Sequence, residues 1–371
     1  MNTPQEFAAL LAALRRLPGD GGGAALATLT RTAGSTFRRA GARMLVLADE
    51  AEDGNGIVRG LSAGCPEQDI AMRAREALKD GSGARVLRYD REHNGDVLME
   101  MGCAGELEVL IEPFATRADW AFALGVEAVL ASRRSGVLAT LYMFDGRLLE
   151  RPTHWLWSDG EICVDEILQA AITGPLGETA RDLPVRHKPS VLSLETGAGR
   201  AEVLIERLEP PNAAWIFGVN ASSLALARLL DQLGWQVTVI DHREVATESP
   251  ELLGTVQRQW CPTEASAATL PLDARGFAVV MTHNLERDIA YLQVLRDAPL
   301  AYIGAVGARR RAAKLFDATG LDATRLRAPC GLDVGSETPE EIALAIAAEM
   351  LSVANGTGGG ALSAIDAPIH R

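Results

Sequence analysis

The chain has 371 residues, which is enough for two domains with hydrophobic cores of their own. Its formal net charge is -13 and its pI is about 5.0, so it repels phosphate backbones, and general nucleic-acid binding is not expected. No apolar run approaches the roughly 20 residues that a membrane span needs. The first residues resemble a short amphipathic helix more than a signal peptide, so we expect a cytoplasmic protein.

The first part of the chain predicts an α+β domain. Residues 24–47 read as two strands joined by a loop rich in glycine, serine and arginine, and residues 57–64 as a further short strand and turn. A helix is expected over 66–79, followed by strands at 84–90 and 106–113.

Two short strand words occur twice in this part. LATL stands at 26–29 and again at 138–141, and EVLIE stands at 108–112 and again at 202–206. The repetition favours two half-motifs, 24–114 and 135–209, within a domain that spans residues 1–210. The simpler alternative is one domain with an irregular middle segment.

The pattern changes after Pro210-Pro211. Apolar strands at 214–219, 235–241, 277–283 and 300–306 alternate with helices, which is typical of a buried parallel sheet. We therefore expect a Rossmann-like domain over 211–356, followed by a flexible tail at 357–371. The chain as a whole is expected to be an α/β protein.

There are five cysteines, at positions 65, 103, 163, 261 and 330. The count is odd and no C-x-x-C occurs, so neither a disulfide framework nor a structural zinc site is expected. Cys65 precedes Pro66 and a helical pattern, which predicts a helix start whose amides favour the thiolate. Cys103 lies between Gly102 and Ala104-Gly105, where small residues let a ligand approach the backbone. The alternative is that both cysteines are packing residues in tight turns.

Several motifs resemble the XdhC/CoxI family of molybdenum-hydroxylase maturation factors. RTAGSTFRRAGARM (31–44), GLSAGCPE (60–67) and MGCAGELEVLIEP (101–113) are similar to its opening loop and its two Gly-Cys turns. MTH (281–283), YIGAVGARRR (302–311) and APCGLDVGSETPEEIALAIAAEM (328–350) are similar to its Rossmann domain. The motifs occur in the family's order, and the resemblance is weakest over 115–210. The sequence departs from the family at GVNASS (218–223), where two close glycines and a histidine are usual, and at Ala63-Gly64-Cys65-Pro66, where Gly-Gly-Cys is usual.

The resemblance implies an accessory factor, a chaperone and not a free-standing enzyme. Such factors bind the molybdenum–molybdopterin cofactor while a cysteine desulfurase supplies its terminal sulfur, and then deliver it to an apoenzyme such as xanthine dehydrogenase. On this basis the candidate sulfur-carrying or catalytic residues are Cys65 and Cys103, with Cys65 also a candidate molybdenum ligand. The flanking Gly64 and Gly102 are candidate cofactor-binding residues. A homodimer is compatible with the sequence.

Basic residues of the first loop are candidates for the phosphate that molybdopterin carries. Arg31, Ser35 and Arg43 belong to this loop, together with Arg38 and Arg39, and arginine forks match phosphate geometry. The alternative is a solvated loop with scattered salt bridges.

The expected Rossmann domain has a second set of candidates. Gly218 and Asn220 occupy the first two glycine positions of G-x-G-x-x-G, and Asp241 stands where an acid binds ribose in dinucleotide folds. Other candidate cofactor-binding residues near strand ends are His283, Gly304, Gly307, Arg309 and Asp333. Because Asn220 replaces glycine, the signal for NAD(P) is weak. An NAD(P)-dependent oxidoreductase and a cofactor-free interaction adaptor therefore stay as alternative functions.

Overall fold

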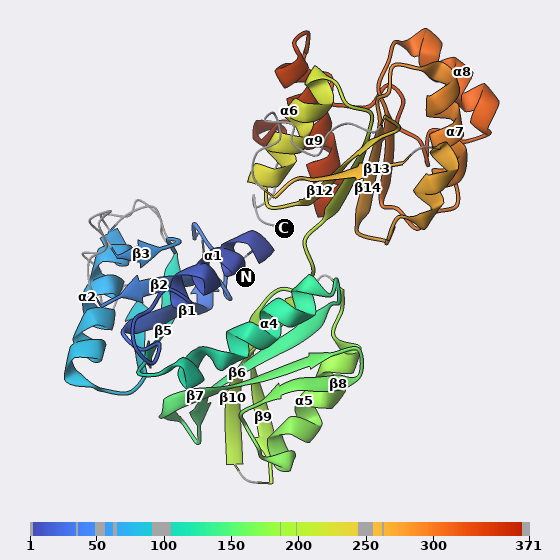
Figure 1. Ribbon diagram of the computed structural model, residues 1–371. Coiled ribbons are helices and arrows are strands. Elements are labelled where there is room, and N and C mark those ends of the chain that lie inside the picture. Colours follow the sequence, from blue (N-terminus) through green and yellow to red (C-terminus); the bar gives the residue numbers. More distant parts are fainter. Residues whose placement is uncertain are drawn as a thin grey trace. The chain divides into compact units, whose positions relative to one another are not determined.

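The computed structural model describes residues 3–34, 36–48, 56–61, 65–90, 105–185, 187–197, 199–243, 255–261 and 263–365 (Figure 1). The chain divides into two compact units, Met1–Pro210 and Pro211–Arg371. The first has antiparallel sheets with helices, and the second has a parallel sheet with helices on both faces. The fold class expected from the sequence is therefore confirmed.

The first unit contains two five-stranded antiparallel sheets with the same topology. Sheet A has the strand order β3-β2-β1-β5-β4, and sheet B has the order β8-β7-β6-β10-β9. The strands of sheet A are β1 (Ala24–Ala33), β2 (Arg43–Leu47), β3 (Ile57–Val58), β4 (Arg85–Tyr89) and β5 (Glu106–Phe114). The strands of sheet B are β6 (Gly136–Phe144), β7 (Arg147–Ser158), β8 (Glu161–Asp165), β9 (Ser190–Thr196) and β10 (Gly199–Leu208).

The helices of this unit follow the same repeated order. Each sheet has one helix before its first strand, α1 (Pro4–Leu14) or α4 (Ala121–Ala131), and one between its third and fourth strands, α2 (Cys65–Asp80) or α5 (Ala170–Asp182). A short 3-10 helix, η1 (Arg117–Trp120), leads into α4. The two LATL words lie in β1 and β6, and the two EVLIE words lie in β5 and β10.

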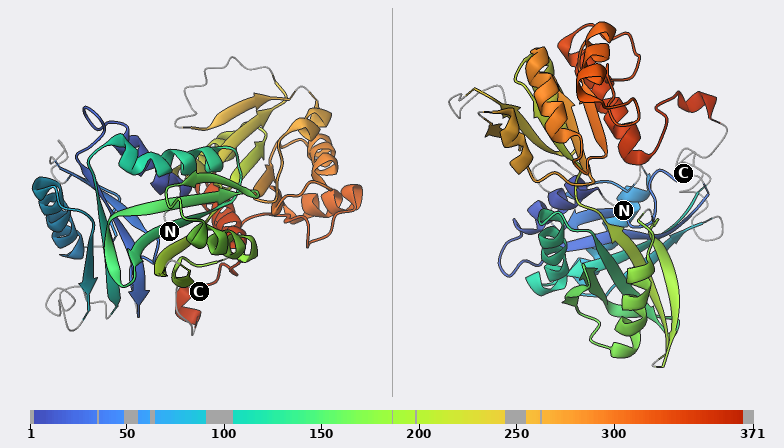
Figure 2. Two further views of the ribbon diagram at one scale, coloured as in Figure 1. Left: turned by 90° about the horizontal axis from the view of Figure 1, so that it is seen from below. Right: turned by 90° about the vertical axis from the view of Figure 1, so that its right-hand side faces the viewer.

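Each sheet buries one face against its own helix and the other face in a shared core. Helix α2 packs on sheet A and α5 on sheet B, on opposite outer sides of the unit (Figure 2). The inner faces meet α1 and α4 in one apolar cluster, to which Leu26 of β1 and Leu138 of β6 contribute as counterparts. The odd-numbered side chains of β1 face α2, as in Ala25, Ala27 and Leu29. Because side chains alternate between the two faces of a strand, β1 contributes to the core under α2 with one set of residues and to the shared core with the other.

A polar seam crosses the shared face. Arg43, 2% exposed, forms a bidentate ion pair with fully buried Glu206 of the other half. At the matching position of the second half, buried His154 has its Nε2 atom 3.2 Å from Oε1 of Glu112. The two contacts occupy equivalent positions in the registers of the two sheets. Arg43 lies opposite Thr28 of β1, and His154 lies opposite Thr140 of β6. Glu112 lies opposite Leu26 of β1, and Glu206 lies opposite Leu138 of β6. Two unlike basic side chains therefore make equivalent cross-half contacts.

The second unit is a doubly wound parallel sheet. Its strand order, β13-β12-β11-β14-β15, reverses at the central strand β11 and is the order of the Rossmann fold. The strands are β11 (Ala213–Phe217), β12 (Gln236–Asp241), β13 (Gln257–Trp260), β14 (Gly276–Val280) and β15 (Tyr302–Ala305). The helices are α6 (Ala221–Gln232), α7 (Leu285–Leu295), α8 (Arg309–Thr319) and α9 (Pro339–Asn355), with short 3-10 helices η2 (Glu264–Thr269) and η3 (Leu362–Ala364).

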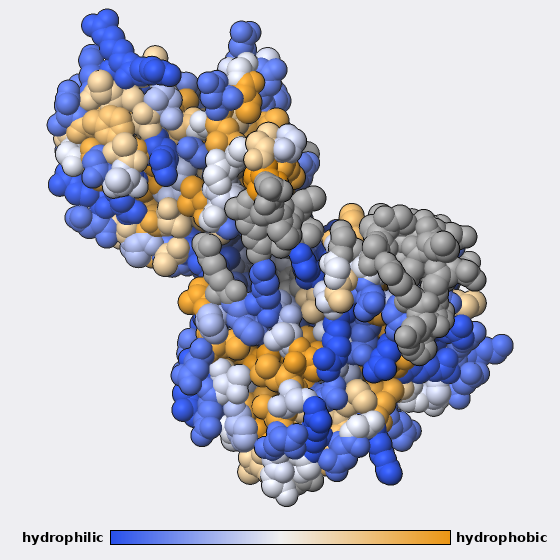
Figure 3. Space-filling view, turned by 180° about the vertical axis from the view of Figure 1, so that it is seen from behind, coloured by the Kyte–Doolittle hydropathy of each residue, from blue (hydrophilic) through white to orange (hydrophobic). Residues whose placement is uncertain are grey.

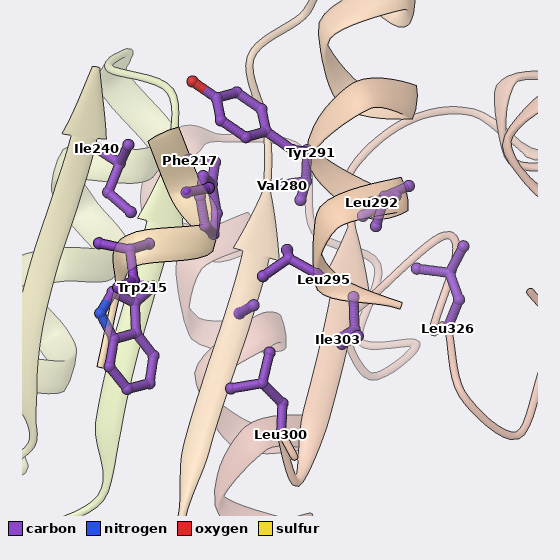
Figure 4. Close-up of a cluster of buried hydrophobic side chains, with 14 of the residues drawn as sticks. Trp215, Phe217, Ile240, Val280, Tyr291, Leu292, Leu295, Leu300, Ile303 and Leu326 are labelled. Atoms are coloured by element: carbon purple, nitrogen blue, oxygen red, sulfur yellow. The ribbon is translucent and has the colours of Figure 1, made fainter. Parts of the chain in front are cut away.

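Helices α6 and α9 cover one face of this sheet, and α7 and α8 cover the other (Figure 1). On the α7 and α8 side, Trp215 and Phe217 of β11 pack with Tyr291 and Leu295 of α7 (Figure 4). Strands buried on both faces are apolar along their length, which explains why they could be recognised in the sequence.

Some strand ends differ from those that the sequence predicts. In the segment expected as a short strand and turn at 57–64, the strand is Ile57–Val58, and Arg59 turns the chain with a φ of 61°. The strand expected at 300–306 is confined to Tyr302–Ala305. Residues 357–365, within the tail expected to be flexible, contain η3.

Breaking the seam should destabilise the first unit. We expect Glu206→Leu to lower the free energy of unfolding by about 3–5 kcal/mol, because it leaves the Arg43 guanidinium buried without its carboxylate. Replacing both partners, Arg43→Met with Glu206→Leu, should restore most of the loss because no buried charge is left. Urea titrations of the full chain measure both values.

The control is the exposed Arg15–Glu127 pair, where Glu127→Gln should cost under about 1 kcal/mol. A double variant as unstable as Glu206→Leu alone would contradict this account of the seam.

Candidate functional site

One edge of sheet A gathers the segments that carry the candidate residues of the first unit. The end of β1 pairs with the start of β5 through Thr32 and Leu107, and Leu107 pairs in turn with Tyr89 at the end of β4. The Tyr89 hydroxyl donates a 2.6 Å hydrogen bond to Asp69, one turn after α2 begins at Cys65. The start of α2, the start of β5 and the end of β1 therefore lie at the same edge.

One of the two candidate cysteines, Cys65, belongs to a described segment at this edge. Cys65 is the first residue of α2, followed by Pro66, so the helix begins one residue earlier than the sequence predicts. Cys103, Gly102, Gly64 and Ser35 lie outside the described residues. In sequence, Cys103 comes three residues before the first residue of β5, Glu106.

A buried carboxylate, Glu108, organises the basic side chains at this edge. Its side chain is 9% exposed and lies 3.3 Å from Nε of Arg31, and it accepts hydrogen bonds from Thr30 at 2.8 Å and Arg88 at 3.1 Å. Arg31, about half exposed, also pairs with Glu202 of the other half at 2.6 Å. The hydroxyl of Tyr142 lies 3.3 Å from Glu108, and burial, followed by the Glu108 charge, raises the pKa of Tyr142 to about 12. Arg31 is thus partly accessible to solvent, while its ion pairs with Glu108 and Glu202 fix its position.

The other candidate arginines of the first loop have different surroundings. Arg43 is buried in the seam, where Glu206 and the carbonyl oxygen of Gly41 accept its hydrogen bonds. Arg38 forms a bidentate ion pair with Glu6 of α1 at 2.8 Å. Of the described candidates in this loop, Arg31 is the one near the edge where α2 and β5 begin.

In the second unit, the candidate residues lie at the carboxyl edge of the sheet, at its topological switch point. Gly218 follows β11 with a φ of 107°, and a Cβ there would lie 2.7 Å from Cα of Thr282, so only glycine fits. Asn220 caps α6 by accepting from the Ser223 amide and donates at 2.8 Å to the Met281 carbonyl oxygen. The asparagine therefore ties the loop after β11 to the loop after β14.

Asp241 ends β12 at the same edge, buried among basic side chains. Arg243 donates to it from its backbone and side chain, and Arg258 donates at 3.3 Å. Burial opposes ionisation, but these hydrogen bonds outweigh it and hold the pKa of Asp241 below its usual value. The carboxylate of Asp241 is therefore already hydrogen-bonded to guanidinium groups. In dinucleotide-binding folds, the acidic residue at this position binds the ribose hydroxyls instead.

The loops after β14 and β15 complete this edge. His283 is exposed in a left-handed conformation with a φ of 60°. Beside it, fully buried Asp288 accepts from Thr282 at 2.5 Å and from Arg311 at 2.6 Å. Gly304 lies in β15, Gly307 has a φ of 151°, and Arg309 begins α8. The contact of Arg311 with Asp288 joins α7 and α8, the helices that follow these two loops.

A buried cluster beside β15 was not predicted. The Tyr302 hydroxyl donates to Glu349 of α9 at 2.6 Å, and the Gly331 amide donates to the same oxygen at 2.8 Å. Cys330 lies beside this group, and burial, followed by the Glu349 charge, raises the pKa of its thiol to about 12. Asp333, three residues further on, is exposed. The neutral state of this thiol differs from the thiolate expected at a helix start.

Neither a metal cluster nor a membrane helix is found in the part of the chain that the structure describes. No group of three or more His, Cys, Asp or Glu side chains there is arranged to hold a metal ion. None of the described helices combines the length and apolar character that a bilayer crossing requires. On the face shown in Figure 3, hydrophilic side chains surround several separate apolar areas.

The two units match one protein family. Residues 19–90 match the XdhC and CoxI family, and residues 214–350 match the XdhC Rossmann domain, so together the matches span more than half of the chain. The chain belongs to the XdhC/CoxI family.

Similar proteins include one of nearly the same length. A Bacillus subtilis (strain 168) protein, named as a probable subunit of xanthine dehydrogenase, is 27% identical over 338 residues, 88% of this chain and 92% of the relative. The uncharacterized protein YqeB of Escherichia coli (strain K12) is 32% identical over 155 residues, 39% of this chain and 28% of the relative. A crystal structure described as a xanthine dehydrogenase from Bacillus halodurans superposes with a TM-score of 0.74 at 22% identity, covering 94% of this chain and 97% of that one. This last likeness shows the fold.

The bridge made by Asn220 can be measured by substitution. We expect Asn220→Ala to lower the free energy of unfolding by about 2 kcal/mol, about half for the helix cap and half for the lost bond to Met281. Asn284→Ala is the matched control, because Asn284 caps α7 through the Arg287 amide, and it should cost about 1 kcal/mol. Equal losses in urea titrations would show that the bridge adds no stability.

Proposed function

We propose that this protein is an accessory factor for a molybdenum hydroxylase of the xanthine dehydrogenase type. In this role it receives the molybdenum–molybdopterin cofactor as cargo, holds it while a cysteine desulfurase supplies the terminal sulfur, and delivers it to the apoenzyme. Family membership supports an accessory role, and the Bacillus subtilis relative is named for xanthine dehydrogenase.

The observation that carries the proposal is the convergence at one edge of sheet A. Cys65 begins α2 and Arg31 lies two residues before the end of β1, both at the edge where Tyr89 contacts Asp69, and in sequence Cys103 comes three residues before the start of β5. Two Gly-Cys turns separated by 38 positions in sequence thus flank elements that are neighbours in the fold. Such convergence is what a single ligand site requires.

The chemistry of these residues suits a soft metal and a sulfur atom. A cysteine at a helix start is favoured as a thiolate by the positive end of the helix dipole and the free amides. A thiolate can ligate molybdenum or carry sulfur as a persulfide, while Gly64 and Gly102 allow the backbone to approach the cargo. Arg31 and Ser35 would provide hydrogen bonds to its anionic groups.

The second unit would contribute through its carboxyl edge. We assign Gly218, His283, Gly304, Gly307, Arg309 and Asp333 there to a nucleotide-like or pterin end of the cargo, or to partner docking. A dinucleotide-dependent oxidoreductase is less favoured on two observations. Asn220 occupies the cap where a pyrophosphate would meet the helix amides, and Asp241 is already engaged by Arg243 and Arg258.

The cargo role predicts the content of the purified protein. Expressed in a host that makes the cofactor, the wild-type chain should contain near-stoichiometric molybdenum and pterin, measured by elemental analysis and by fluorescence after oxidation. Cys65→Ala and Cys103→Ala should each lower both contents at least tenfold, because the soft ligands are lost.

Cys163→Ala is the control, because Cys163 is exposed on β8 of sheet B, and it should match the wild type. Wild-type protein without pterin under any expression condition would refute the cargo role. Unchanged content in both cysteine variants would refute the thiol assignment.

A further inference from the structure

A cavity of about 390 Å³ lies beside β4, which among the described strands pairs with β5 alone. Residues 86–89 of β4 line it, between Asp69 and Arg73 of α2 on one side and Met143 and Leu148 of the β6–β7 hairpin on the other. Consecutive side chains of a strand point to opposite faces. A cavity lined by four consecutive residues therefore follows the outer edge of β4, the side that faces away from β5.

A hydrogen bond at the start of β4 shows which backbone groups point to this outer edge. The Ala84 amide, one residue before β4, donates at 2.8 Å to the Glu150 carbonyl oxygen of β7, away from β5. In a strand, the N–H and C=O groups of one residue point to the same side, and alternate residues repeat this direction. The backbone groups of Val86 and Arg88 therefore point to the outer edge, and those of Leu87 point to β5.

The hydrogen bonds of the other strands of sheet A give the same direction independently. The Leu29 amide of β1 donates at 2.9 Å to the Ala42 carbonyl oxygen, on the β2 side, so the neighbouring Thr28 faces β5. Thr28 lies opposite Leu110 of β5, and Leu110 lies opposite Val86 of β4. Leu110 therefore bonds to β1, and the backbone groups of Val86 point outward.

The outward groups of Val86 are unpaired. Neither its amide nor its carbonyl oxygen has a hydrogen-bond partner in the part of the chain that the structure describes. A donor and an acceptor at the edge of a sheet are matched in direction and spacing by another extended chain, which can add to the sheet. The outer edge of β4 is therefore a template for one further strand.

The surroundings of the cavity limit what can enter it. Strand β7 occupies the edge before β4 begins, where a Cβ on Gly83 would lie 2.7 Å from the Glu150 carbonyl oxygen, so the close approach needs glycine. From Val86 to Tyr89 the edge offers about 10 Å, the length of about three extended residues. Because α2 and the β6–β7 hairpin form walls on either side, the cavity admits a single extended segment more readily than the edge of another sheet.

The charges around the cavity are balanced. Nε of Arg73 lies 3.5 Å from Asp69, its Nη1 lies 3.8 Å from Glu76, and Arg88 donates at 3.1 Å to Glu108. Because each guanidinium is paired with a carboxylate, the cavity has no excess of either sign that would attract a charged ligand. An uncharged segment is therefore favoured.

The hairpin wall adds a preference for apolar side chains. Met143 and Leu148 lie opposite each other in the β6–β7 ladder, and both line the cavity. Side chains of a bound strand alternate in direction, so every second one would pack on this wall. Methionine adapts to side chains of different shapes. An alternation of apolar and uncharged polar residues thus suits the cavity.

We propose that the outer edge of β4 docks an extended, uncharged segment of a partner protein, which pairs with Val86 and adds a strand to sheet A. Alternate apolar side chains of the segment pack on Met143 and Leu148. Because α2 forms the other wall, the docked partner lies beside the helix that begins at Cys65. The inference does not rest on the cargo role, since it follows from the backbone of sheet A.

A dansyl-labelled peptide amide of the sequence Val-Thr-Val-Thr-Val is a suitable probe, because it is short, uncharged and alternates apolar with polar side chains. The full chain should bind it saturably in fluorescence titrations. Two further versions, N-methylated at the odd or at the even positions, separate edge pairing from side-chain contact. Only one edge of the bound strand faces β4, so one version should bind like the parent peptide and the other at least about tenfold more weakly.

Val86→Pro removes the outward amide without breaking a bond to β5, which an edge strand tolerates, and should weaken peptide binding at least about tenfold. Leu148→Asp places a charge on the apolar wall and should weaken binding several-fold. Val191→Pro is the matched control, because Val191 of β9 lies opposite Leu204 of sheet B as Val86 lies opposite Leu110 of sheet A. It should bind like the wild type. Melting curves check the fold of each variant, and Leu148→Asp provides the independent reading if Val86→Pro melts early.

The inference is overturned if the wild type shows no saturable binding, if both methylated versions bind equally, or if Val191→Pro loses binding as strongly as Val86→Pro. Sedimentation of the chain without peptide tests the other occupant, a second copy. A dimer that Val86→Pro converts to a monomer would assign this edge to self-association and refute a partner segment. A mass that is the same in the wild type and in Val86→Pro supports partner docking.

Discussion

The buried cross-half contacts of the first unit are the constraint on which the rest of that unit depends. A bidentate Arg43–Glu206 pair, removed from water, is stable only while both partners remain in place. The matching contact of His154 with Glu112 lies between the same two sheets, and Phe122 of α4 stacks on the His154 ring at 3.5 Å. These contacts fix the register in which sheets A and B face each other. They specify one pairing of the halves, which an apolar interface alone would not.

This fixed register has consequences at the edge of sheet A. Glu108 receives Arg31 and Arg88 from its own half and Tyr142 from the other, so the side chains at the edge are set by both sheets. The same pairing brings the β6–β7 hairpin, with Met143 and Leu148, beside β4. A change in the seam would therefore shift the wall of the cavity and the surroundings of Arg31 together. Stability and the candidate site are therefore linked through the pairing of the two halves.

Much of the fold could be predicted because its strands follow simple patterns. The apolar strands of the second unit and the Thr338 cap of α9 are local signals. Strands β7 to β9 and helix α5 were not predicted, because strands such as β7, RLLERPTHWLWS, have apolar residues at adjacent positions and no clear alternation. The equivalence of Arg43 and His154 also could not be predicted from the sequence, because unlike residues occupy the matching positions. Asn220 could be predicted as a modified turn, but its bond to Met281, 61 residues away, depends on tertiary structure.

Hydrogen–deuterium exchange of the full chain tests the central claim most directly, that the cargo is held at the edge of sheet A. Protein from a cofactor-making host would be compared with protein from a host that lacks the cofactor. The account predicts slower exchange in the cargo-containing protein for the first turns of α2, residues 65–73, and for residues 86–90 at the end of β4. Exchange that is unchanged there and slowed only at the carboxyl edge of the second unit, around 218–223 and 281–284, would contradict it.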